Sequence, residues 1–448
     1  MSNLDFLQPL REKYSHEPTF LQAVEEMAMA LLPLFEDEKN GAFYKRAFVA
    51  MTEPERVISF RVPWEDDNGN IQFNRGWRVE FNSVLGPYKG GLRLHPTVDS
   101  GVLKFLGFEQ IFKNALTGLP MGGGKGGSDF NPKGKSEGEV RRFCVSFMTE
   151  LFRYLHPSTD VPAGDIGVGG REIGYLYGQY KRLTNKHGEG VLTGKGLNWG
   201  GSPLRPEATG YGLVYMTKLA VEKRLGRTLE AMRCAVSGSG NVAQFASEKL
   251  LGYGAKVITV SDSNGVLVFD DGMTQDDLHA VMECKNVQRD RLRSLDGKVS
   301  GRYVDGESPW SLDMKYDLAL PCATQNEIDG DAARRLVKNG VLGVLEGANL
   351  PTNMEAQKVI RDKGDVIYVP GKASNAGGVG VSGLEMSQNS QRLTWTREEV
   401  DSKLKDMMAN IYKQMENSSG KDGTLEEGAN RAGFLKVAEA MKDLGWVQ

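Results

Sequence analysis

Apolar and polar positions follow two different periods in the first part of the chain. Between residues 18 and 50, apolar residues recur at helical spacing among acidic ones, which predicts helical structure. Two later runs, 56–64 and 71–81, alternate between apolar and polar residues and flank the turn-forming sequence Asp-Asn-Gly. They predict a β-hairpin. Glycine-rich loops then alternate with helix-like segments up to residue 184, so we expect this part to be mixed α/β.

A regular alternation of helical and extended patterns begins beyond residue 206. A helical pattern at 209–225 precedes an apolar, strand-like run at 233–237, and a second such run at 256–260 follows the next helical stretch. Further strands are predicted at 318–320, 343–345 and 366–369. This βαβ order predicts a parallel sheet with helices on both faces.

These patterns predict an α/β protein of two domains with a cleft between them. Residues 1–200 are expected to form a mixed α/β domain for substrate binding and assembly, and residues 201–424 a Rossmann-like, doubly wound dinucleotide-binding domain. The turn-rich stretch 198–206 is the predicted hinge. The last helix, 425–448, is expected to pack back on the first domain. The length of 448 residues suits two or three domains of about 150 residues each.

Composition narrows the class of protein. The net charge of −3 gives no basic excess for a nucleic-acid partner. No run of about 18 apolar residues could span a membrane, and the N-terminus has no apolar signal segment, so we expect a cytoplasmic protein without a membrane partner. The four cysteines lie far apart and the five histidines lack ligand spacing, which predicts neither disulfides nor a metal site. The 55 glycines gather in local clusters, which is typical of tight loops around ligands.

One glycine cluster has the features of a dinucleotide-binding loop. The run Gly-Ser-Gly-Asn-Val-Ala at 238–243 follows a predicted strand and opens a helix, and Asp262 ends the next strand. The first glycine suits the tight turn, the second lets a pyrophosphate approach the backbone, and the free N–H groups of the helix start bind phosphate. The expected cofactor contacts in this region are Gly238, Ser239, Gly240, Asn241, Val242 and Asp262.

The residues alone leave the choice between NAD and NADP open. Asp262 favours NAD, because an acid at this position binds the ribose 2′-hydroxyl. Ser263 follows it, and the cations Lys285, Arg289 and Arg291 lie downstream, which suits the 2′-phosphate of NADP. A solvated helix face would give the same row of cations.

Three lysines and one aspartate are the candidates for chemistry on a substrate. Lys89 lies in a glycine turn, Lys113 shares a predicted helix face with Gln110, and Lys125 lies among five glycines, which we expect to let a substrate approach closely. Three such cations suggest a dicarboxylate substrate, although Lys89 and Lys113 could also be ordinary surface lysines. Asp165, in a second glycine-rich loop, could form an acid/base pair with Lys125 or simply make a turn.

Several longer runs resemble the hexameric, NADP-dependent glutamate dehydrogenases of the Glu/Leu/Phe/Val dehydrogenase superfamily. The resemblance covers nearly the whole chain, with the motifs in family order. The runs that carry it are GPYKGGLR at 86–93, FLGFEQIFKN at 105–114, GGGKGG at 122–127, PAGDIGV at 162–168, EATGYG at 207–212 and NAGGVGVS at 375–382.

The resemblance implies roles for individual residues. Lys125 matches the family's catalytic lysine, and Asp165 matches its proton-transfer aspartate. Lys89 and Ser382 match positions that hold the distal carboxylate of glutamate, and we expect closure of the cleft to bring them together, because they fall on different predicted domains. The positions that match the α-carboxylate and reaction-centre contacts are Gln110, Lys113, Gly164 and Asn375.

The same resemblance favours NADP as the cofactor. Thr209 and Asn349 match positions near the nicotinamide, and Asn241 faces the cofactor. Ser263 and Lys133 match positions that approach the 2′-phosphate, where Lys285 is also expected. The family implies a homohexamer.

The activity that follows is the reversible reductive amination of 2-oxoglutarate with ammonium and NADPH to L-glutamate. Lys125 would polarise the 2-oxo group, and Asp165 would carry protons as ammonia adds and water leaves. The alternatives are an NAD-preferring or apolar amino-acid dehydrogenase of the same superfamily, and a catalytically silent NADP-binding regulator. A cation at position 89 argues against an apolar pocket, and an intact Lys125 and Asp165 argue against a silent protein.

Overall fold

The chain forms two compact units. The computed structural model describes residues 4–187, 190–420 and 423–447. The first unit contains the described residues up to Arg205, together with Val379–Val400 and the residues from Asn430 onward. The second unit contains Pro206–Gly378 and the described residues of Asp401–Ala429.

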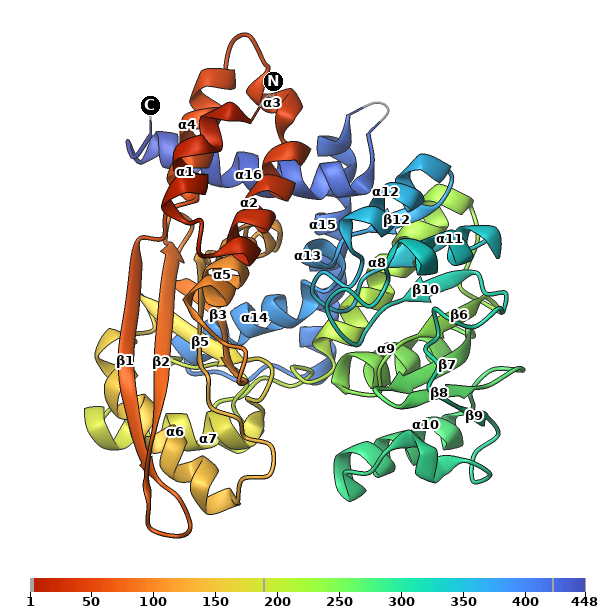
Figure 1. Cartoon of the computed structure of the whole chain (residues 1–448), viewed down its shortest axis with the longest axis horizontal. Coiled ribbons are helices and arrows are strands. Elements are labelled where there is room, and N and C mark those ends of the chain that lie inside the picture. The colour runs from red at the N-terminus through yellow and green to blue at the C-terminus, as the bar shows by residue number, and fades with distance from the viewer. Residues whose placement is uncertain (1–3, 188–189, 421–422, 448) are drawn as a thin grey trace. The chain divides into compact units, whose positions relative to one another are not determined.

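The first unit is built on a mixed five-stranded sheet in the order β1-β2-β4-β3-β5 (Figure 1). Its strands are β1 (Arg56–Glu65), β2 (Ile71–Asn82), β3 (Tyr88–Leu94), β4 (Gly123–Ser128) and β5 (Asp160–Gly164). β1 and β2 form the predicted antiparallel hairpin, with Arg56 opposite Glu80. β4 runs antiparallel to β2 and parallel to β3, which in turn is parallel to β5.

Among the described residues, seven α-helices of the first unit precede the hinge region in the chain. They are α1 (Gln8–Lys13), α2 (Pro18–Ala30), α3 (Leu32–Phe35), α4 (Gly41–Met51), α5 (Ser100–Leu116), α6 (Glu137–Leu151) and α7 (Gly170–Thr184). The region 18–50, for which the pattern predicts helix, is divided into α2, α3 and α4. Pro33 cannot donate a backbone hydrogen bond to α2 and lies in the first turn of α3 instead.

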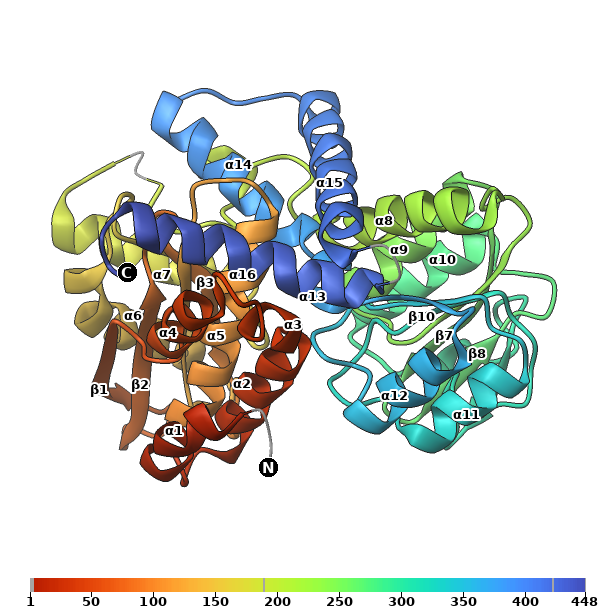
Figure 2. The ribbon, with the colours of Figure 1, turned by 90° about the horizontal axis from the view of Figure 1, so that it is seen from above.

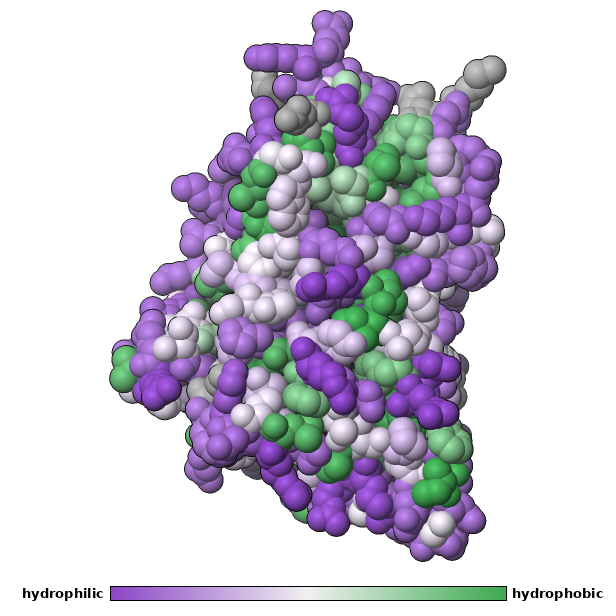
Figure 3. Space-filling model, turned by 90° about the vertical axis from the view of Figure 1, so that its left-hand side faces the viewer, coloured by the Kyte–Doolittle hydropathy of each residue, from purple (hydrophilic) through white to green (hydrophobic). Residues whose placement is uncertain are grey.

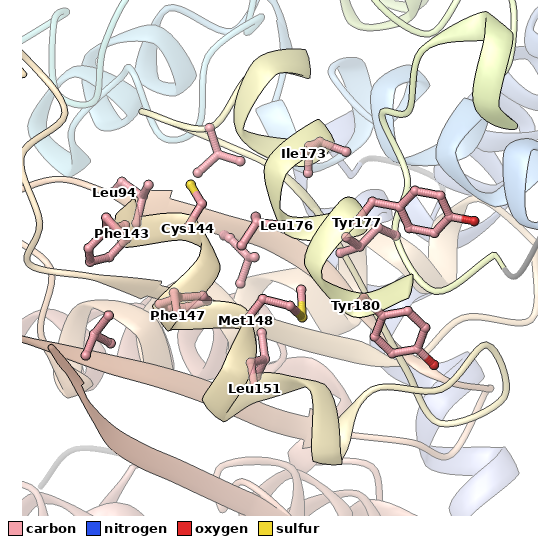
Figure 4. Close-up of a cluster of buried hydrophobic side chains, with 14 of the residues drawn as sticks. Leu94, Phe143, Cys144, Phe147, Met148, Leu151, Ile173, Leu176, Tyr177 and Tyr180 are labelled. Atoms are coloured by element: carbon pink, nitrogen blue, oxygen red, sulfur yellow. The ribbon is translucent and has the colours of Figure 1, made fainter. Parts of the chain in front are cut away.

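Different helices and side chains pack on the two faces of this sheet. Val79 pairs with Lys125, so both point to the face on which α5 packs, and Gly107 of α5 lies against Lys125. Arg78 and Leu92 each pair with Gly126 and therefore point to the opposite face. That opposite face carries a hydrophobic core with α6 and α7 (Figure 4). Phe143 and Phe147 of α6 and Leu176 and Tyr180 of α7 recur at four-residue spacing in this core.

Two C-terminal segments complete the first unit. In α16 (Leu425–Asp443), the part from Asn430 onward belongs to this unit, and Figure 2 shows this helix beside α4. Its Phe434 packs edge-on against Phe35 and near Phe48. Residues 379–400, which we expected in the second domain, also belong to the first unit. The cause is α14 (Gly377–Gln391), on which Gly383 packs so closely against Leu119 that a Cβ would lie 2.5 Å from the leucine side chain.

The second unit is a doubly wound α/β unit. Its sheet order is β12-β11-β10-β6-β7-β8-β9, and all its strand pairs are parallel except those of β8. The strands are β6 (Arg233–Val236), β7 (Lys256–Asp262), β8 (Gly265–Val268), β9 (Arg302–Asp305), β10 (Leu318–Leu320), β11 (Gly343–Leu345) and β12 (Ile367–Val369).

Helices cover both faces of this second sheet. Figure 2 shows α8 and α9 on one side and α11 and α12 on the other. The helices of the unit are α8 (Ala208–Leu225), α9 (Asn241–Gly252), α10 (Gln275–Met282), α11 (Gly330–Lys338), α12 (Met354–Lys363), α13 (Gly371–Ser374) and most of α15 (Arg397–Ser419). The predicted fold class, an α/β protein with a mixed first unit and a doubly wound second unit, is confirmed.

Candidate active site and dinucleotide site

The glycines around Lys125 let strands approach one another. A Cβ at Gly126 would lie 2.9 Å from Arg78 Cδ, and a Cβ at Gly123 would lie 2.6 Å from the Ile111 side chain. On the neighbouring β3, a Cβ at Gly90 would lie 1.7 Å from the carbonyl oxygen of Gly124. These glycines therefore allow the strands of the sheet to pack closely. The approach of a substrate to them stays a prediction.

Arg78 occupies the space that these glycines leave. Its fully buried guanidinium donates from Nε to Asp160 Oδ2 at 2.8 Å and from Nη2 to the other oxygen of the same carboxylate. Nη1 donates to the carbonyl oxygen of Gly90 at 3.0 Å. The side chain starts on β2 and passes beneath β4 to reach β3 and β5. One buried pair thus ties together the strands that carry Lys89, Lys125 and Gly164.

Lys125 and Asp165 form an ion pair. Lys125 Nζ lies 3.2 Å from Asp165 Oδ2, and Arg93 Nε donates to the same oxygen at 2.8 Å. Burial alone would raise the pKa of Asp165, but the charges of Lys125 and Arg93 lower this pKa to about 2. Burial lowers the pKa of Lys125, and Asp165 opposes that shift. Lys125 and Asp165 are predicted from the sequence. Arg93 is not, because its contact with Asp165 depends on the pairing of β3 with β5.

Gln110 and Lys113 lie on the same face of α5, as their spacing predicts. Gln110 Nε2 donates to Asn114 Oδ1 at 2.7 Å, and Asn114 in turn donates to the carbonyl oxygen of Lys89 at 2.9 Å. Burial, followed by the charge of Lys125, lowers the pKa of Lys113 to about 7. Lys113 is therefore close to its titration point at neutral pH. Gly164 is the last residue of β5 and directly precedes Asp165.

Lys89 is a buried cation rather than a surface lysine. Its Nζ donates to the carbonyl oxygen of Val161 at 2.9 Å and to Thr193 Oγ1 at 2.8 Å. Burial, followed by the charge of Arg205, holds the pKa of Lys89 well below its ordinary value. Both partners are uncharged oxygens, which suits an ammonium group that also binds an anionic ligand.

Ser382 belongs to the same unit as Lys89. Its Oγ accepts a hydrogen bond from Arg205 Nε at 2.8 Å. The expectation that Lys89 and Ser382 lie on different domains and meet through closure of a cleft is wrong, because residues 379–400 return to the first unit. Two cations, Lys89 and Arg205, and one hydroxyl therefore surround a candidate subsite for a carboxylate within that unit.

The second unit has the expected dinucleotide loop at the carboxyl end of β6. Gly238 has a φ of +84°, which favours glycine, and its N–H donates to Ser261 Oγ at 2.8 Å. Gly240 is the N-cap of α9, and apart from its neighbours along the chain no described atom lies within 4 Å of the position that a Cβ would take there. Ala243 is fully buried. The chain moves from β6 to β7 on one side and returns to β10 on the other, and ligands bind at such a switch point. The residues fit a dinucleotide.

The residues predicted to distinguish NADP from NAD are only partly brought together. Ser263 Oγ accepts a hydrogen bond from Arg291 Nη1 at 2.7 Å. Asp262 accepts from the backbone N–H of Leu292 at 2.9 Å, so this acid holds the loop that carries Arg291. Lys285 Nζ instead donates to the carbonyl oxygen of Asp290. Arg291 is thus the cation that the structure places beside Ser263, and Lys133 belongs to the first unit.

Two asparagines form a second polar cluster in this unit. Asn375 Nδ2 donates to Asn349 Oδ1 and to the carbonyl oxygen of Ala348, each at 3.0 Å. Asn375 Oδ1 is buried and has no hydrogen-bond partner among the described residues. A ligand donor at this acceptor would satisfy it. The predicted place of Asn375 in the substrate pocket stays a prediction, and its hydrogen-bond partner is Asn349. Thr209 lies in the first turn of α8.

The described part of the chain lacks the features of several other kinds of site. No group of three or more histidine, cysteine or acidic residues there is arranged to hold a metal ion. The four cysteines are buried thiols. A membrane-spanning helix, which needs a long apolar run, is not found among the described residues.

Known proteins resemble this chain over nearly its full length. Residues 200–445 match the family Glutamate/Leucine/Phenylalanine/Valine dehydrogenase, and residues 54–182 match the Glu/Leu/Phe/Val dehydrogenase dimerisation domain. The NADP-specific glutamate dehydrogenase of Salmonella typhimurium is 54% identical over 97% of each chain. The NAD(P)-specific glutamate dehydrogenase of Xylanibacter ruminicola is 52% identical over 99% of this chain and 100% of its own.

A solved structure gives the same result in three dimensions. Glutamate dehydrogenase 2 of Plasmodium falciparum is 53% identical, with a TM-score of 0.92 over 99% of this chain and 96% of that chain. Family matches, sequence relatives and the solved structure all indicate the same family. The chain belongs to the Glutamate/Leucine/Phenylalanine/Valine dehydrogenase family.

Proposed function

We propose that this protein catalyses the reversible reductive amination of 2-oxoglutarate with ammonium and NADPH, which yields L-glutamate. The observation that carries the proposal is the buried contact between Lys125 and Asp165, with Lys113 nearby and the cations Lys89 and Arg205 in the same unit. A pocket that buries so many cations fits a substrate with two carboxylates. Relatives that are about half identical over full length are named glutamate dehydrogenases.

Each carboxylate of the substrate has its own partners. Lys89, Arg205 and Ser382 bind the distal carboxylate, because a buried ammonium, a guanidinium and a hydroxyl offer three donors of the right kind. Lys113 and Gln110 bind the α-carboxylate on the opposite side of the reacting carbon. Such charged hydrogen bonds fix the orientation of the 2-oxo group.

Lys125 supplies electrostatic stabilisation at the reacting carbon. Its ammonium donates to the 2-oxo oxygen and stabilises the negative charge that develops there as ammonia adds. The anionic Asp165 accepts the proton that the added ammonia loses and returns a proton to the departing water. A carboxyl with a pKa of about 2 is a weak base, but an anionic substrate beside the same cations weakens their hold on it.

NADPH, when bound, supplies the hydride that reduces the resulting imine. The helix start at Gly240–Asn241 binds its pyrophosphate, and Ser263 with Arg291 binds the 2′-phosphate. Asn349 and Asn375 bind the nicotinamide carboxamide, because the open acceptor of Asn375 suits its N–H. Lys133 and Lys285 remain candidate partners of the 2′-phosphate.

We infer that copies of this chain assemble, and that the assembly is a hexamer. β1 is the edge strand of the first sheet, and this hairpin exposes the apolar side chains of Val57, Ile71 and Phe73, of which Phe73 is 62% exposed. Figure 3 shows hydrophobic patches among hydrophilic residues on this side of the unit. The region matched as a dimerisation domain includes this hairpin. Light scattering should give six times the chain mass of 49.2 kDa.

The location inside the cell is also part of the proposal. The four cysteines are unpaired and buried, and the thiols of such proteins persist in a reducing compartment. We place the enzyme in the cytoplasm. Fractionation of the source cells should recover the activity with cytoplasmic marker enzymes.

One absorbance assay tests the activity. Purified protein with 2-oxoglutarate and ammonium should oxidise NADPH, and NADH at a lower rate, whereas 2-oxohexanoate should be a poor substrate. Faster turnover of 2-oxohexanoate would favour an apolar amino-acid dehydrogenase, and faster use of NADH would favour an NAD enzyme. Tight binding of NADPH without oxidation in the presence of any 2-oxo acid would indicate a silent regulator.

A further inference from the structure

A buried ion pair joins α14 to the loop that precedes the hinge. Lys195 Nζ donates to Glu385 Oε1 at 2.8 Å and to Asn389 Oδ1 at 2.8 Å, and both charged side chains are almost completely buried. Glu385 also accepts the backbone N–H of Gly194 at 3.0 Å and that of Lys195 at 3.3 Å. The pair therefore fixes the loop and the helix relative to each other.

The elements that this pair joins carry the partners of the distal carboxylate. Thr193, two residues before Lys195 in the loop, accepts the hydrogen bond from Lys89 Nζ. Ser382 lies one helical turn before Glu385 on α14 and accepts the hydrogen bond from Arg205. Movement of the loop away from α14 would separate Thr193, the partner of Lys89, from Ser382, the partner of Arg205. Neither Lys195 nor Glu385 contacts the substrate in the proposed reaction.

The charge of Glu385 acts on both cations of the subsite. Burial lowers the pKa of Lys89 and that of Arg205, and the negative charge of Glu385 opposes both shifts. Glu385 also lies one helical turn beyond Ser382, the partner of Arg205, so its carboxylate can compete with a substrate carboxylate for the same cations. Lys195 offsets this competition, because its ammonium pairs with Glu385 directly.

We propose that Lys195 and Glu385 are positioning residues that set the selectivity of the subsite for an anionic rather than a neutral side chain. Lys195 neutralises Glu385 and leaves Lys89 and Arg205 available to the distal carboxylate. Glu385 limits the repulsion among three buried cations, so that the pocket holds its shape without substrate. The inference rests on the proposed function, since it assigns that carboxylate to this pocket.

Two single-charge changes test the proposal in opposite directions. Lys195→Gln and Glu385→Gln each keep a side chain of similar length that can still form a hydrogen bond. We measure kcat and KM for 2-oxoglutarate and for the neutral 2-oxohexanoate, and take the ratio of the two kcat/KM values. Lys195→Gln should lower this ratio about 10-fold, through KM for 2-oxoglutarate. Glu385→Gln should raise the ratio, because it removes the competing anion.

The double variant and a matched pair provide the controls. Lys195→Gln/Glu385→Gln restores the charge balance, so its ratio should return to within about threefold of the parent. Glu17 and Lys104 form another buried ion pair of the first unit, at 2.9 Å, and play no part in the proposed site. Glu17→Gln and Lys104→Gln should leave the ratio unchanged, even where they lower the melting temperature.

A purely structural clamp would give a different result. Both single variants would then shift the ratio in the same direction, or would reduce kcat equally for the two substrates, and either result overturns the proposal. Calorimetric binding of glutarate, a dicarboxylate without a reacting group, gives a readout that does not depend on turnover. Weaker glutarate binding in Lys195→Gln and tighter binding in Glu385→Gln would uphold the charge effect even if the parent did not aminate 2-oxoglutarate.

Discussion

The two units use glycine for opposite purposes. In the first unit, a Cβ at any glycine of β3 or β4 would lie within 4 Å of other protein atoms, and a Cβ at Gly90 would overlap the backbone of the next strand. In the second unit, the position of a Cβ at Gly240 is open space at the start of a helix. The two glycine-rich motifs look alike in sequence. The glycines of the first unit allow neighbouring strands to pack closely, whereas Gly240 leaves a surface for a ligand.

The comparison also separates the chemistry of the two units. The first unit buries cations around Lys125, and its candidate ligands are carboxylates. The second unit presents backbone N–H groups at a helix start, and its candidate ligand is a pyrophosphate. Changes in one unit should therefore alter substrate turnover, and changes in the other should alter binding of NADPH.

The largest expected effect is on folding. Gly90→Ala should destabilise the first unit by several kcal/mol, because the added methyl would lie 1.7 Å from the carbonyl oxygen of Gly124. We expect a melting temperature lower by on the order of 10 °C, or insoluble protein. Calorimetry checks this, and a variant as stable as the parent would show that β3 and β4 are less tightly packed than described.

The next largest effect is on catalysis. Lys125→Ala should fold and bind NADPH with nearly the parent affinity, because the dinucleotide loop belongs to the other unit. Its turnover should fall by about 100-fold or more, since it removes the ammonium that stabilises charge on the 2-oxo oxygen. Turnover and NADPH fluorescence titration measure the two properties separately. Turnover within a few-fold of the parent would reject the role of Lys125.

Much of this comparison could be predicted from the sequence. Local patterns identify the hairpin, the βαβ unit and its glycine loop, since alternation and loop chemistry depend on neighbouring residues. Lys125 and Asp165 are also predicted, because each lies in a distinctive glycine-rich run. The reason for the glycines around Lys125 could not be predicted, because it depends on Arg78, which comes from another strand.

The features that the sequence did not predict depend on contacts between segments that are distant in the chain. The return of residues 379–400 to the first unit brings Ser382 to Arg205, across 177 positions of sequence. Glu385 meets Lys195 across 190 positions. Arg93 and Asp165 share a hydrogen bond only because β3 and β5 are neighbours in the sheet. No local pattern of residues indicates such pairs.

A smaller effect is the pH dependence of substrate binding, which involves the first unit alone. Lys113, with a pKa of about 7 in the free protein, must be protonated to bind a carboxylate, and binding raises that pKa. The complex should therefore take up about half a proton at pH 7 and close to one at pH 8. KM for 2-oxoglutarate should rise about fivefold between pH 7 and 8, and about tenfold per pH unit above pH 8.

Calorimetry in two buffers of different ionisation enthalpy measures this proton uptake. Lys113→Arg is the matched control, because a guanidinium keeps its charge throughout this pH range and should abolish the uptake. Equal uptake in Lys113→Arg would assign the titration to another group.

The smallest effect concerns the open glycine of the second unit. Gly240→Ala should leave the melting temperature within about 1 °C of the parent, because its methyl meets no described atom. NADPH should bind several-fold more weakly, since the methyl occupies the surface where the pyrophosphate approaches the backbone. Destabilisation as large as that of Gly90→Ala would remove the contrast between the two units.

The central claim is that buried cations of the first unit select a dicarboxylate. The most direct measurement is the ratio of kcat/KM for 2-oxoglutarate to that for 2-oxohexanoate, in the parent and in Lys89→Leu/Ser382→Val. The double change removes the ammonium and the hydroxyl that a distal carboxylate needs, and losing charged hydrogen bonds of about 1.5–3 kcal/mol each should lower the ratio by about 100-fold or more. An unchanged ratio would contradict the account, because the distal carboxylate would then bind elsewhere.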